Sequence, residues 1–179
     1  MPSASSSLAH ILCVLIFVGR IGDLLSTRLA TPTLKLEANP IVRRLGWRFA
    51  VLTLLLCLIP YYNTALGVVA VVFNFVFCFS NFGKVWLLRT MGETEYDALL
   101  CSLARRSTLS SALIPFFTAQ GFLASVGCIL LLLSGGEGSW SFWGAIGLLV
   151  AAFGLTLHGT LFIVRLFRRA AMLDRVGAG

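Results

Sequence analysis

An arginine and an aspartate lie three residues apart in the first long apolar stretch of the sequence. Arg20 and Asp23 fall on one side of a helix, with Thr27 four residues further on. An ionisable group inside a bilayer is costly and is expected to face the protein interior beside a partner. The spacing therefore predicts an Arg20–Asp23 pair. Three roles stay open for it: an ion pair that fixes packing, a site for an ion or a proton, and a lipid-headgroup site.

Two later apolar stretches also carry polar residues. Asn74, Cys78 and Asn81 form one stripe at helical spacing, and His158 lies in the last stretch. An imidazole there can hydrogen-bond to another helix, relay protons, or ligate a metal or cofactor. Metal ligation normally needs two or three further ligands, and His10 is expected at the opposite face of the membrane. The sequence therefore nominates no metal site and identifies no cofactor.

The composition indicates whether these residues lie in a soluble protein or in a membrane protein. The 179 residues are 58% hydrophobic and 12% charged, with a mean hydropathy of +0.93. Soluble domains hold about 25% charged residues, so the chain is expected to be an integral membrane protein in the lipid bilayer. The net charge of +7 would suggest nucleic acid as the partner of a soluble chain. In a membrane chain it reports topology, and we expect no nucleic-acid partner.

Apolar segments of about 20 residues can each cross a bilayer. Residues 49–88 are almost uniformly apolar, and as one helix they would be about 60 Å long, twice the hydrocarbon thickness. They must fold back at the cluster Pro60–Thr64, and Pro40 is expected to begin the second helix. We predict an all-α polytopic membrane helix bundle in a single membrane domain, residues 1–179. Its five transmembrane helices are expected at about 8–29, 45–61, 65–88, 110–133 and 140–167.

A short amphipathic helix is predicted between the third and fourth spans, at about 94–106. Thr94 and Asp97 have the spacing of a capping box, and leucines follow at helical intervals. Such a helix lies at the membrane surface. It serves either as a connector or as a docking site for a soluble partner.

The basic residues test the span assignment, because cytoplasmic loops accumulate Lys and Arg. The five-span arrangement places all of them except Arg20 on one side of the membrane. We therefore predict an N-terminus outside and a C-terminus in the cytoplasm, in a plasma membrane or bacterial inner membrane. The basic side is also expected to contact anionic lipid headgroups.

The segments 22–27 and 36–40 together make up one pattern. Asp23 and Thr27 in the first segment are followed by Glu37, Asn39 and the proline that begins the next helix in the second. This pattern, about 20 residues long, resembles one in small uncharacterised prokaryotic multi-pass membrane proteins. The resemblance implies that these four residues act together. With Arg43 and Arg44 nearby, they form either an internally neutralised corner or a niche for a cation or a headgroup at the cytoplasmic boundary.

The sequence lacks the common catalytic motifs, including HExxH, GxSxG and a glycine-rich phosphate loop. The first functional hypothesis is a non-enzymatic subunit or accessory component of a membrane complex. It would bind a protein partner, or copies of itself, through the small-residue faces of the first and fifth spans. These faces contain Gly19, Gly22 and Ser26, and Gly147, Ala151 and Gly154.

The alternative is a small ion, proton or solute transporter or channel, and an intramembrane enzyme is a third hypothesis. The residues expected to line a transport path are Arg20, Asp23, Asn74, Asn81 and His158. A path requires these side chains to converge on a hydrated cavity. A packing role requires them to be singly paired and dry.

Overall fold

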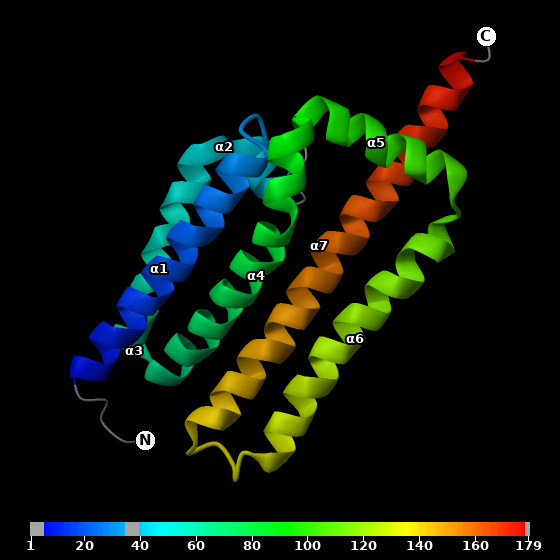
Figure 1. The fold of residues 1–179 in the computed structure, drawn as a ribbon. Helices are drawn as coiled ribbons and strands as arrows, with labels where there is room; N and C mark the ends of the chain where they lie inside the picture. The colour runs from blue at the N-terminus through cyan, green and yellow to red at the C-terminus, as the bar shows by residue number, and fades with distance from the viewer. Residues whose placement is uncertain (1–5, 35–39, 178–179) are drawn as a thin grey trace.

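The computed structural model describes residues 6–34 and 40–177, and every regular element in that part of the chain is helical (Figure 1). The elements are α1 (Ser6–Ala30), α2 (Pro40–Leu52), the 3-10 helix η1 (Thr53–Leu58), α3 (Ile59–Tyr62), α4 (Thr64–Met91), α5 (Glu93–Arg106), α6 (Leu109–Leu133) and α7 (Trp140–Gly177).

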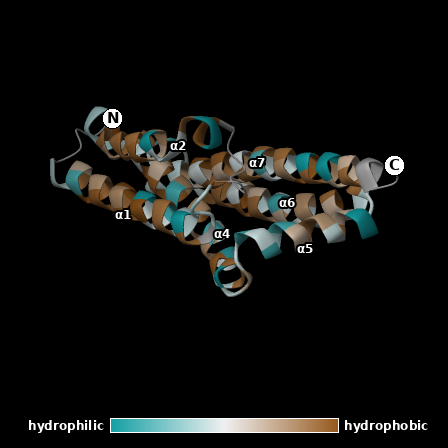
Figure 2. Ribbon diagram, turned by 90° about the horizontal axis from the view of Figure 1, so that it is seen from above, coloured by the Kyte–Doolittle hydropathy of each residue, from teal (hydrophilic) through white to brown (hydrophobic). Residues whose placement is uncertain are grey.

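Five segments are long and apolar enough to cross a membrane, as predicted. They are Ser6–Leu29, Ile41–Tyr62, Thr64–Met91, Leu109–Leu133 and Trp140–Leu173. Figure 2 shows hydrophobic turns along the long helices, and Phe122, Leu132 and Phe153 expose most of their side chains. Exposed apolar surface of this kind suits contact with lipid tails.

The predicted reversal after the second span occurs at Asn63. This residue is extended (φ −155°) between α3 and α4, and its side-chain oxygen accepts a hydrogen bond from the backbone N–H of Leu66 at 3.1 Å. Pro60 packs closely against Gly67, because a β-carbon added to Gly67 would lie 3.0 Å from the Cβ of Pro60. A capping asparagine and a close proline–glycine contact therefore make the turn tight enough for the chain to recross the membrane.

The second span is less regular than the single helix expected over residues 45–61. Its helical segment starts at Pro40, as predicted, but Gly46 breaks the helix with φ +73°. No side chain or backbone atom would crowd a β-carbon on Gly46, so the positive φ is what requires glycine there. The span then tightens into the 3-10 helix η1 before α3.

The cap of α5 and the end of the last helix differ from the sequence prediction, although α5 itself covers nearly the predicted residues. The capping box expected from Thr94 and Asp97 is wrong, because α5 begins at Glu93 and its N-cap is Gly92 (φ +83°), without a side-chain cap. The last helix continues well beyond residue 167. Its extension packs against α5, where Arg169 and Asp97 form an ion pair at 2.8 Å.

Helix α4 occupies the centre of the molecule, between α1 and α7 (Figure 1). The most extensive contacts join α1 to α4, α6 to α7, and α4 to α7, while η1 and α3 pack on α1. Helix α5 crosses one end of this arrangement, which we call the α5 end. The opposite end, with α3 and the α6–α7 turn, is called the α3 end.

The predicted polar stripe of the third span faces α1. A β-carbon on Gly19 would lie 3.3 Å from the Cβ of Asn74, and one on Gly22 would lie 2.8 Å from the Sγ of Cys78. One turn further along, Asn81 donates a hydrogen bond to an α1 side chain. The small residues of α1 thus admit the polar stripe of α4 at close range.

The glycines of the fifth span also face α4. A β-carbon on Gly147 would lie 2.8 Å from the Cβ of Val72 and 3.1 Å from the backbone oxygen of Val69. At Gly154 it would meet the ring of Phe77 at 3.1 Å. Both of the small-residue faces singled out in the sequence therefore pack within the chain, against its own central helix.

Candidate functional site

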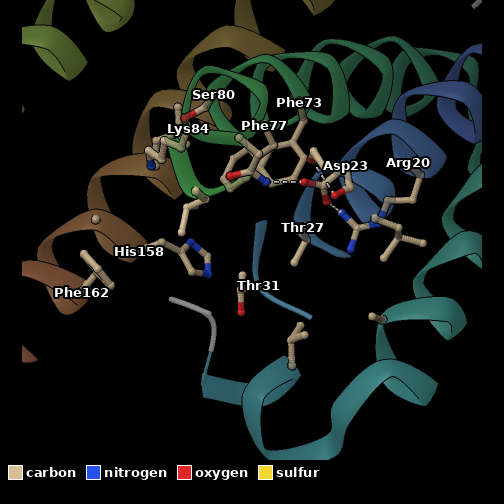
Figure 3. A pocket seen from close by; sticks show the side chains of 18 of the residues that line it. Arg20, Asp23, Thr27, Thr31, Phe73, Phe77, Ser80, Lys84, His158 and Phe162 are labelled. Atoms are coloured by element: carbon tan, nitrogen blue, oxygen red, sulfur yellow. Dashed lines mark hydrogen bonds and ion pairs between the residues drawn. The ribbon is translucent and has the colours of Figure 1, made fainter. Parts of the chain in front are cut away.

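A cavity of about 350 Å³ lies between α1, α4 and α7 (Figure 3). Its lining includes Thr31, Leu88 and Tyr96, so it lies in the half of the molecule nearer the α5 end. Its polar lining residues are Arg20, Asp23, Ser26, Thr27, Thr31, Ser80, Asn81, Lys84, Tyr96, Gln120 and His158. Its aromatic lining residues are Trp47, Phe73, Phe77, Phe116 and Phe162. A few convergent polar groups among aromatic walls are typical of small-molecule sites.

The cavity brings together all but one of the residues proposed for an intramembrane polar site. These are Arg20, Asp23, Thr27, Asn81 and His158. Asn74 does not line it. That side chain is 2% exposed and donates to the carbonyl oxygen of Ala70 at 2.8 Å. Its own oxygen is buried without a hydrogen-bond partner, in the contact between α1 and α4.

Asp23 is held by two donors, one of which is the predicted partner. Arg20 Nη1 donates to Asp23 Oδ2 at 2.6 Å, and Asn81 Nδ2 donates to Asp23 Oδ1 at 2.6 Å. The Nε of Arg20 donates to the Thr53 hydroxyl at 2.8 Å. Helices α1 and α4 thus meet at one carboxylate, and η1 joins them through the guanidinium of Arg20. Each carboxylate oxygen keeps a second lone pair for a ligand.

His158 enters the cavity from α7, on the side facing α1 (Figure 3). The Nδ1 of His158 lies 2.8 Å from the backbone oxygen of Gly154, so its hydrogen bond stays within its own helix. The ring meets Phe77 of α4 edge to face, with centroids 6.0 Å apart. The backbone bond and the aromatic contact together fix the imidazole at the cavity wall.

Side chains of α5 form hydrogen bonds at the α5 end of the cavity and line it there. The carboxylate of Glu93 accepts hydrogen bonds from the hydroxyls of Thr31 and Thr33, at 2.9 and 2.8 Å. Tyr96 lines the cavity, and burial raises the pKa of its phenol above the ordinary value of 10.0. Tyr96 is therefore a neutral hydroxyl at pH 7. Helix α5 also connects the segment that follows α1 to α7 at this end.

The niche proposed at the membrane boundary is only partly covered by the structure. Glu37 and Asn39 lie outside the described residues. Arg43 and Arg44 are exposed on the first turn of α2. Thr27, the remaining member of the pattern, lines the cavity with Asp23.

Sequence reasoning missed part of the cavity although a signal was present. Phe73, Phe77, Ser80, Lys84 and Leu88 recur at three- and four-residue intervals, so they share one face of α4 with Asn81. The contributions of α5 and α6 carried no such signal. Tyr96 and Gln120 reach the cavity only because α5 crosses from the end of α4 to α7 and because α6 packs against α7.

Comparison with models of protein families, with curated proteins and with solved structures finds no match to this chain. Within residues 6–34 and 40–177, no group of three or more His, Cys, Asp and Glu side chains is arranged to hold a metal ion. The site must therefore be interpreted from its own geometry.

Proposed function

We propose that the chain is a small membrane transporter that binds a polar solute or an ion in the cavity between α1, α4 and α7. The observation that carries this proposal is the convergence of Asp23, Asn81 and His158, from three different helices, on one cavity. Ionisable side chains that face a cavity from separate membrane spans are typical of substrate and ion pathways. The side chains around Asp23 hold its charge in place without filling the cavity.

The other hypothesis, a non-enzymatic subunit of a membrane complex, has less support. It depended on the small-residue faces of the first and fifth spans as surfaces for a partner or a second copy. Gly22 and Gly147 use those faces to approach α4 of the same chain. A cavity lined by charged and hydroxyl side chains also has no role in a purely packing function.

The proposed orientation places the α5 end in the cytoplasm and the α3 end outside, in a plasma membrane or bacterial inner membrane. The last turns of α1 and α4 and the end of α5 carry Arg28, Arg89, Arg105 and Arg106. All of these lie at the α5 end (Figure 1). Such clustering favours the cytoplasm, and it also favours contact with anionic headgroups.

Single cysteines at exposed positions are expected to report this orientation. Native Cys101 is buried and a poor probe, whereas Ser107 and Glu137 are exposed at the α5 end and the α3 end. In sealed cells, an impermeant maleimide should label Glu137→Cys at once and Ser107→Cys only after permeabilisation. The unmodified chain gives the background. The reverse pattern contradicts the orientation, and labelling of both in sealed cells contradicts five spans.

Filling the cavity tests transport without removing a charged group. Ser80 lines the cavity, and Ser125 is an exposed serine of α6. Proteoliposomes with reporters for H⁺, Na⁺, K⁺ and Cl⁻, and swelling assays with neutral solutes, should show flux for the unmodified chain. Ser80→Phe should lower that flux several-fold, because the phenyl ring occupies part of the cavity that the solute or ion must enter. Ser125→Phe should leave it unchanged.

Two results argue against the proposal. One is an unmodified chain that moves none of these ions or solutes. The other is a Ser80→Phe variant that folds and retains full flux, because a path through the cavity cannot survive a phenyl ring placed in it.

A further inference from the structure

His158 offers the cavity one ring nitrogen in a defined state. A backbone carbonyl oxygen accepts hydrogen bonds and cannot donate them, so the contact of Nδ1 with the oxygen of Gly154 requires a hydrogen on Nδ1. In the neutral ring, Nε2 then carries a lone pair and no hydrogen. The backbone thus fixes the tautomer and leaves Nε2 as a proton acceptor.

The surroundings keep this nitrogen available. His158 points into the cavity towards Thr31 (Figure 3). Its edge-to-face contact with Phe77 is a ring contact and not a hydrogen bond to a ring nitrogen. The side chain is only half-buried. Nε2 is therefore the atom of this imidazole that a proton or a ligand in the cavity can reach.

Other charged and titratable groups face the same cavity from the elements around His158. They are Arg20 and Asp23 from α1, Lys84 from α4 and Tyr96 from α5, while the lining residues described on α2 and α6 include none. Asp23 is already engaged by Arg20 and Asn81. Imidazole is the only side-chain type that ordinarily changes charge between about pH 5 and 8. Among the described lining residues, His158 therefore combines proton-exchanging chemistry with a ring nitrogen that faces the cavity.

We infer that the cavity carries a proton, bound to Nε2 of His158. The inference rests on the proposed transport function and names its ion. In the loaded state, a proton forms an N–H bond with the Nε2 lone pair while Nδ1–H stays bonded to the Gly154 oxygen. In the release step, that N–H bond breaks, the electron pair returns to Nε2, and water or a base at the cavity mouth takes the proton.

Proton flux in proteoliposomes tests the inference. Trapped pyranine reports internal pH while valinomycin and a potassium gradient set the driving potential. The unmodified chain should acidify the interior, and His158→Gln should lower the rate by about tenfold or more, the scale of losing a proton-transfer group. His10→Gln is the matched control, because His10 lies on the first turns of α1 at the α3 end against Tyr61, away from the cavity. It should retain the rate.

A second measurement uses only the unmodified chain, so it stands even if the variant misfolds. Nitrogen-15 NMR of histidine-labelled protein should show the neutral ring of His158 with its hydrogen on Nδ1. On acidification, a second hydrogen should appear on Nε2. His10→Gln then serves to assign the signal.

The outcomes separate this inference from the transport proposal. Proton flux that persists in His158→Gln overturns the inference while transport stands, as does flux of another ion without protons. A chain that moves nothing overturns transport. The NMR measurement then tests the proton site alone. A neutral ring with its hydrogen on Nε2, or a ring that gains no second hydrogen on acidification, overturns the inference.

Discussion

Replacing Asp23 with alanine is expected to destabilise the folded chain by about 3–5 kcal/mol, because it leaves a partly buried guanidinium without its counter-charge. The side chains of Arg20 and Asp23 are 15% and 11% exposed and lie 2.6 Å apart. Asn81 loses its acceptor in the same step. Unfolding by sodium dodecyl sulfate in mixed micelles measures the change in free energy.

The exposed pair at the α5 end gives the matched control. Asp97 and Arg169 lie at a similar distance, 2.8 Å, but Arg169 is 59% exposed. Asp97→Ala should therefore cost less than about 1 kcal/mol. The double change of Arg20→Leu with Asp23→Leu should recover much of the lost stability, because no charge is left uncompensated. If Asp23→Ala proves as stable as the parent, the carboxylate is hydrated and the pair does not fix the fold.

The same double variant also separates stability from transport. Asp23 and Arg20 line the cavity, so a chain that folds without them has lost the Arg20–Asp23 ion pair from it. On the transport proposal, it should unfold at nearly the parental detergent concentration and yet carry less flux. Full flux would place the transport path away from Asp23.

Much of the fold follows from local features of the sequence. The length of each apolar run and the turn at Pro60–Thr64 specify five crossings, because a helix of fixed rise must match the bilayer. The Arg20–Asp23 pair depends only on positions three apart in one helix. The stripe of Asn74 and Asn81 is likewise a property of one helix. Features of this kind need no knowledge of which helices are neighbours.

To predict the cavity, one must know which helices are neighbours, and the sequence does not give this. Helical spacing placed the glycines of the first and fifth spans on smooth faces, but it gave no information on whether another chain or α4 covers them. The structure places α4 against both. The same pairing brings Asn81 to Asp23 and puts His158 across the cavity from them. The capping box predicted for α5 was wrong for a local reason, since Gly92, with a positive φ, ends α4 and is also the N-cap of α5.

Replacing Gly147 with alanine is expected to destabilise the chain by about 1–3 kcal/mol, through overpacking of α7 against α4. The new β-carbon would lie 2.8 Å from the Cβ of Val72 and 3.1 Å from the backbone oxygen of Val69, and neither atom is the free end of a flexible side chain. Gly144→Ala, in the same helix, meets nothing within 4 Å and should be neutral or stabilising by up to about 1 kcal/mol, since alanine favours helix. Detergent unfolding of both variants measures the difference. Equal stability of the two would mean that α7 does not approach α4 this closely, and the cavity between them and α1 would lose its wall.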